Sequence, residues 1–61
     1  MEQLEVGQRV SVVEDKHIPG FIGKPGTVEE VLPDGSGMVR FRGDETAKWR
    51  YRPAALRKGW R

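Results

Sequence analysis

Cysteine is absent from this chain of 61 residues, and histidine occurs only once, as His17. Without cysteine the chain has neither a disulfide nor a thiolate ligand for a metal, which is typical of proteins of a reducing compartment. A metal site needs several ligands, so His17 alone is expected to lie on the surface or to pack within a loop. The sequence therefore predicts no metal and no other cofactor.

Long apolar runs are absent too. No segment approaches the length of a membrane span or of the apolar region of a signal peptide, so we expect a soluble cytoplasmic protein. The opening residues, Met1-Glu2-Gln3, are typical of the start of an intact small protein. No serine or threonine stands near a plausible base in the expected fold, which predicts that the protein is not an enzyme and has no catalytic residues.

Helical periodicity is also missing, because eight glycines and four prolines divide the chain into short segments. We expect a first strand within residues 4–13, a long loop over 14–25, and a second strand over 26–32 that bulges between Val28 and Val31. A turn at 33–37 leads into two further strands, at 38–42 and 48–52. Residues 53–56 suit a 3₁₀ turn, and 57–60 suit a short last strand.

These elements predict one all-β domain over residues 1–61, a small five-stranded SH3-like barrel with a short 3₁₀ turn before its last strand. Closing the sheet would remove most exposed strand edges, which so short a chain has little else to cover. The expected core contains one of the two aromatic residues Trp49 and Tyr51. Its other members are Val6, Val10, Val12, Val28, Val31, Val39, Phe41 and Leu56.

The two strands at 38–42 and 48–52 carry the most informative pattern, because apolar and cationic residues alternate along both. Side chains of a strand alternate between its faces, so the apolar residues face one side and the cations the other. A hairpin loop over 43–47 would place Arg42 opposite Lys48 and Arg40 opposite Arg50. Like charges opposite each other are mildly destabilising, so a chain that tolerates them is expected to use them for an anionic partner.

The distribution of charge along the chain agrees with a single cationic surface. Residues 1–30 hold six acidic and three basic side chains, a charge of −3, whereas residues 31–61 hold three acidic and eight basic ones, a charge of +5. The alternative is an ordinary solvated outer face. The long loop around Phe21 suits either a ligand groove or a cover over the barrel end, and Trp60 either a barrel plug or an exposed contact. The predicted partner-binding residues are the cations Arg40, Arg42, Lys48, Arg50 and Arg52 and the aromatic residues Phe21, Trp49 and Trp60.

Several short motifs are similar to those of known families. Residues 6–10, 23–28, 34–35 and 39–41 resemble the common core of SH3-like barrels, which include Tudor and KOW-type domains. Residues 48–56 resemble the end of mind-bomb-type repeats, which bind peptides. The Gly-Gln-Arg-Val opening at 7–10, the Gly-Lys-Pro-Gly-Thr-Val stretch at 23–28 and the Asp-Gly-Ser-Gly turn at 34–37 are shared with small cyanobacterial photosynthetic subunits, which most of the chain resembles. Among these subunits are a cytochrome b6f subunit and the ferredoxin-docking subunit of the photosynthetic NDH complex. These resemblances imply a docking or regulatory subunit without a cofactor.

A further likeness, to the plasmid-borne type II dihydrofolate reductases, implies an enzyme. Their active strand, Val-Gln-Ile-Tyr, aligns with residues 48–51, where only Tyr51 matches and the glutamine is missing. The sequence therefore favours a non-enzymatic binding module, an adaptor that engages an acidic protein surface or peptide. The alternative is a nucleic-acid-binding barrel of the KOW or Tudor kind, in which the cations contact phosphates and the aromatic residues stack on bases.

Overall fold

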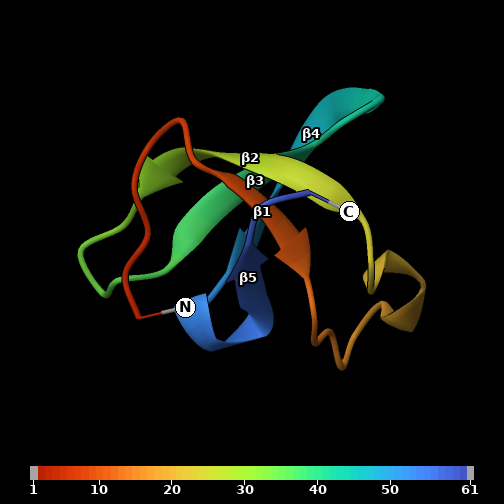
Figure 1. Ribbon diagram of the computed structural model, residues 1–61, viewed down its shortest axis with the longest axis horizontal. Coiled ribbons are helices and arrows are strands. Elements are labelled where there is room, and N and C mark those ends of the chain that lie inside the picture. The colour runs from red at the N-terminus through yellow and green to blue at the C-terminus, as the bar shows by residue number, and fades with distance from the viewer. Residues whose placement is uncertain (1, 61) are drawn as a thin grey trace.

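Five short antiparallel strands form one sheet in the computed structural model, which describes residues 2–60 and, for Glu45, the backbone alone (Figure 1). The strands are β1 (Arg9–Val12), β2 (Pro25–Val31), β3 (Gly37–Phe41), β4 (Asp44–Tyr51) and β5 (Leu56–Lys58). Two 3₁₀ turns, η1 (Pro19–Phe21) and η2 (Pro53–Ala55), stand in the loop after β1 and directly before β5. The predicted fold class, all-β with five strands and a 3₁₀ turn before the last, is confirmed.

The strand order is β4-β3-β2-β1-β5, so β4 and β5 are the two ends of the sheet. Within the described residues, the hydrogen-bonded ladder does not join β4 to β5, so the sheet is open between these two strands. The short turn η2 connects these two strands along the chain and is fastened to the residues that follow β1. The carbonyl of Ala55 accepts hydrogen bonds from the amides of Val13 and Glu14, at 2.8 and 3.3 Å.

The core fills the inside of the bent sheet with aliphatic side chains. Six of the predicted core residues are almost fully buried. Of the two aromatic candidates for the core, Tyr51 is buried, with 7% exposure, whereas Trp49 is only partly buried. Two predictions were wrong: Val6 is 67% exposed and Val31 is 38% exposed. The buried aliphatic set is completed by two residues that the pattern missed, Leu4 and Ala55.

Local backbone geometry explains both errors. Gly7 has a φ of 89°, so the chain turns there and the alternation of β1 does not reach back to Val6. Leu4 fills the space beside Gly37 instead, where an added Cβ would lie 2.7 Å from the leucine Cδ1. The predicted bulge of β2 is confirmed by a register shift between Val28 and Glu30, which pairs Val31 with the inward-facing Gly37. Val31 is the last residue of β2, and at this end of the strand its side chain is only partly covered.

The hairpin between β3 and β4 differs from the expected one. Gly43 has a φ of 84°, which allows a tight turn at residues 42–43, so residues 44–47 continue the strand instead of forming a loop. The register places Val39 opposite Trp49 and Met38 opposite Arg50. The predicted pairs of Arg42 with Lys48 and of Arg40 with Arg50 are therefore wrong.

Candidate functional site

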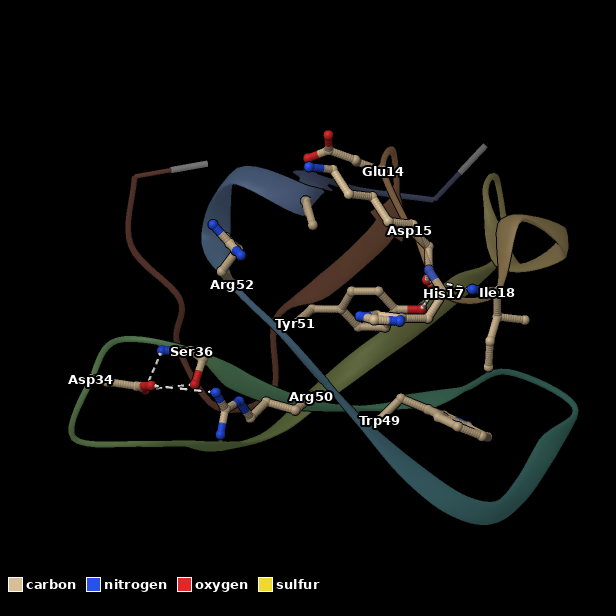
Figure 2. Close-up of a pocket in the computed structure, with 12 residues that line it drawn as sticks. Glu14, Asp15, His17, Ile18, Asp34, Ser36, Trp49, Arg50, Tyr51 and Arg52 are labelled. Carbon is tan, nitrogen blue, oxygen red and sulfur yellow. Dashed lines mark hydrogen bonds and ion pairs between the residues drawn. The ribbon is translucent and has the colours of Figure 1, made fainter.

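A pocket of about 590 Å³ lies between the loop after β1 and the end of β4 (Figure 2). Tyr51 lies in the middle of this groove. In Figure 2, Arg50 and Arg52 lie to one side of Tyr51, and Trp49 and Ile18 to the other. The remaining lining comes from the loop residues Glu14, Asp15, Lys16 and His17, the turn residues Asp34 and Ser36, and Ala55 of η2.

A row of aromatic rings links the groove to the core. Trp49 packs edge-on against Phe21, with ring centroids 5.0 Å apart, and Phe21 packs in the same way against the buried Phe41, at 4.9 Å. Phe41 in turn lies 6.2 Å from Tyr51. Phe21 is thus half-buried between a groove residue and the core, which makes it a support for Trp49 as well as part of the loop. Trp49 itself is half-buried and lines the groove.

One carboxylate, that of Asp15, fastens the loop to β4. Its Oδ2 accepts a hydrogen bond of 2.5 Å from the hydroxyl of Tyr51, and its Oδ1 accepts bonds from the amides of His17 and Ile18, at 3.0 and 2.8 Å. The Tyr51 hydrogen bond, with those amides, lowers the pKa of Asp15. Burial, with the hydrogen bond to the Asp15 carboxylate, raises the pKa of Tyr51. Both groups are therefore held in the charge states that keep the bond.

A second carboxylate, that of Asp34, orders the turn between β2 and β3. It accepts hydrogen bonds from the hydroxyl and the amide of Ser36, at 2.5 and 3.0 Å, and the hydroxyl bond is the main reason that the pKa of Asp34 is lowered. Its Oδ2 lies 3.9 Å from the guanidinium of Arg50, at the outer limit of an ion pair. Arg50 remains 66% exposed.

The charges of the groove are mixed, with three carboxylates and three cations in its lining. Asp15 and Asp34 already hold internal hydrogen bonds, and Asp34 also faces Arg50. Within the described residues, Lys16 and Arg52 have no ion-pair partner. The groove therefore offers an aromatic floor with cations on one side, and its chemistry suits noncovalent binding.

The predicted site residues do not form one face. Trp49, Arg50 and Arg52 line the groove, with Phe21 packed beside Trp49. Lys48 is exposed on β4 outside the groove lining. The other three belong to a second, smaller cleft of about 280 Å³ on the outer face of β2 and β3, lined in part by Arg40, Arg42 and Trp60.

Two of the residues that organise the groove were not found from the sequence, Asp15 and Ser36. Each takes part in a short loop motif in which an aspartate oxygen accepts an amide two residues later, and such motifs are visible as Asp-Lys-His and Asp-Gly-Ser. The 36-residue separation between Asp15 and Tyr51 leaves no such local signal.

No family model, curated protein or solved structure matches this chain. Among residues 2–60, no helix is long and apolar enough to cross a membrane. In the same part of the chain, no group of three or more histidine or carboxylate side chains is placed to hold a metal ion. The groove geometry is therefore the main basis for a proposal about function.

Proposed function

We propose that this chain is a non-enzymatic docking module that holds a short acidic segment of a partner protein in the groove between the loop after β1 and the end of β4. The observation that carries the proposal is the placement of Trp49 and Tyr51 beside Arg50 and Arg52 in one groove. Tryptophan, tyrosine and arginine are the residue types that contribute most to binding energy at protein interfaces. The sequence expectation of an acidic partner is kept, but its site moves from a broad strand face to this groove.

The apolar contact is supplied by the aromatic floor. Trp49 is held at one edge by Phe21, and Tyr51 is held by its bond to Asp15, so neither ring has to be ordered when a ligand arrives. Preorganised side chains lose less conformational entropy on binding, which favours affinity. A ligand residue with an aromatic or branched apolar side chain fits between Trp49 and Ile18.

The charged contact is supplied by Arg50 and Arg52. Arg50 has only a long contact with Asp34, so a carboxylate of the ligand competes with it readily. Arg52 is exposed and has no carboxylate partner in the described part of the chain. Such exposed charges mainly set orientation and association rate, and each contributes about 1 kcal/mol or less. The expected ligand is thus a peptide with acidic residues beside one apolar residue.

Selection from a random peptide library on the immobilised protein tests this proposal. We expect enrichment of peptides that combine Asp or Glu with an aromatic or branched apolar residue. Fluorescence anisotropy with one such labelled peptide should then show a roughly five- to tenfold loss of affinity in the Arg50→Gln/Arg52→Gln variant.

The matched control is Arg9→Gln/Arg42→Gln, which removes the same two charges outside the groove lining. It should keep the peptide affinity within about twofold, since distant exposed charges are largely screened by salt. Equal losses in the two variants would show that only net charge matters. Enrichment of neutral or basic peptides, or of none, would overturn the proposal.

A further inference from the structure

A second surface on the outer face of the sheet is rich in arginine. Residues paired across neighbouring strands share a face, and Arg9 of β1 is paired with Thr27 of β2, which is paired with Arg40 of β3. Gly26, the residue before Thr27, faces inward, because an added Cβ there would lie 2.6 Å from the side chain of the buried Val39. The row Arg9, Thr27 and Arg40 therefore faces outward.

The C-terminal segment places an indole ring on this outer face. The Nε1 of Trp60 donates a hydrogen bond of 2.7 Å to the carbonyl of Gly26, which fixes the ring against β2. The guanidinium carbon of Arg9 lies 4.6 Å from the ring centroid, and that of Arg42 lies 5.0 Å from it. Two guanidinium groups are thus held over one fixed ring by cation–π contact.

A third arginine belongs to the same face. Arg57 of β5 is paired with Ser11 of β1, and Ser11, two residues after Arg9, lies on the same face as Arg9. The hydroxyl of Ser11 donates a hydrogen bond to the carbonyl of Gly59, where the C-terminal segment covers the sheet. Ser11 is paired with Pro25, and Pro25 accepts a hydrogen bond from the amide of Arg42. We call Arg9, Arg42 and Arg57, together with the Trp60 ring that Arg9 and Arg42 contact, the arginine patch.

Carboxylates of the protein neutralise little of the positive charge of the arginine patch. The nearby carboxylate of Glu29 lies 3.0 Å from Nε of Arg40 and is engaged there. In the described part of the chain, Arg9, Arg42 and Arg57 have no carboxylate partner. The patch reaches from the end of β3 across β2 and β1 to β5, three strand spacings or roughly 14 Å.

Several guanidinium groups spread over this width suit a ligand that carries charge at several points. Arginine binds phosphate oxygens bidentately, and a stacked guanidinium loses little freedom when it does so. An acidic protein is less suitable, because protein interfaces depend on apolar anchors and the ring of Trp60 already lies under two arginines. The same contacts leave the ring poorly placed to stack on a base.

We propose that the arginine patch binds the phosphate backbone of double-stranded nucleic acid without reading its sequence. The arginine patch shares no residue with the groove lining, so one molecule has room for both ligands. This proposal stands apart from peptide docking in the groove, and the failure of either leaves the other standing.

Fluorescence anisotropy with a labelled duplex DNA of mixed sequence, about 20 base pairs long, tests the proposal over a salt series. Non-specific binding of this kind has a Kd on the order of 10⁻⁵ M near physiological salt. Each neutralised phosphate contributes about −0.9 to the slope of log K against log salt, so three arginines predict a slope of about −2.7. A single Arg9→Gln change should make this slope less steep by about one.

The paired variants serve again as reciprocal controls. Arg9→Gln/Arg42→Gln should weaken duplex binding at least tenfold at ~50 mM salt, whereas Arg50→Gln/Arg52→Gln, with the same net charge, should change it less than threefold. An unchanged far-ultraviolet circular dichroism spectrum and thermal midpoint show that each variant folds. No duplex binding at ~50 mM salt, equal effects of the two variants, tighter binding of single strands, or acidic peptides that compete for the patch would each overturn the proposal.

Discussion

Replacing Phe41 with alanine should unfold the protein at room temperature. Phe41 is 1% exposed and lies between the rings of Phe21 and Tyr51, so its removal leaves a cavity at the centre of the aromatic row. Truncation of a buried phenylalanine costs about 3–5 kcal/mol. A domain of 61 residues has a free energy of unfolding of roughly 3–9 kcal/mol in all. One substitution therefore removes at least about a third of the stability, and all of it if the free energy of unfolding lies in the lower part of this range.

The assay is thermal and urea denaturation followed by circular dichroism. Each kcal/mol shifts the thermal midpoint of so small a domain by about 4–8 °C, so Phe41→Ala is expected to show no folded baseline at 25 °C or a midpoint lowered by at least ~12 °C. Phe41→Leu keeps most of the apolar volume and should cost only about 1 kcal/mol, which makes it the matched control. A cooperative transition above ~50 °C in Phe41→Ala would refute the assignment of Phe41 to the centre of the core.

Three further predictions concern the hydrogen bond between Asp15 and Tyr51 and the close packing of the backbone at Gly26. Because the pKa of Asp15 is lowered by the Tyr51 hydroxyl, the stability that it contributes is present above the usual value of 3.8 and is lost as pH falls through the folded pKa. Asp15→Asn should lower the urea midpoint at neutral pH, and a difference that persists at about pH 2 would contradict this. Tyr51 is the single tyrosine, so the absorbance of phenolate follows its ionisation alone. Burial, with the hydrogen bond to Asp15, raises the pKa of Tyr51, and ionisation at or below the usual value of 10.0 would show that this bond is absent. Gly26→Ala should lower the free energy of unfolding by about 1–3 kcal/mol, because the added Cβ would lie 2.6 Å from the Val39 side chain. Gly20→Ala should leave the stability nearly unchanged, because an added Cβ there meets nothing within 4 Å. A larger loss for Gly20→Ala than for Gly26→Ala would refute the close packing at Gly26.

Much of the fold is predictable from local sequence signals. The alternation in β3 correctly separates the buried Val39 and Phe41 from the cations, and the changed apolar spacing after Val28 marks the observed bulge. These predictions succeed because a period of two residues and the turn residues act within a few positions of each other. The register of the β3–β4 hairpin was missed because a tight turn at Gly43 and a longer loop both fit the same glycine.

The candidate site was less predictable, because its contacts join residues far apart in the chain. The bond between Tyr51 and Asp15 spans 36 positions, and the bond from Trp60 to Gly26 spans 34. The first contact brings the loop after β1 beside Arg50 and Arg52, which line the groove. The second holds the indole of Trp60 on the outer face of the sheet, where Arg42 stacks on it. Alternation along a strand indicates which face a cation takes but not which neighbours the bent sheet brings to it.

The two tryptophans allow the central proposal, peptide docking in the groove, to be measured directly, because Trp49 lines the groove and Trp60 lies on the arginine patch. In the Trp60→Phe variant, titration with a selected acidic peptide should shift the emission of Trp49 to saturation, with the same Kd as anisotropy gives. Peptide binding seen by anisotropy without any change in the Trp49 emission would place the ligand elsewhere and contradict docking in the groove.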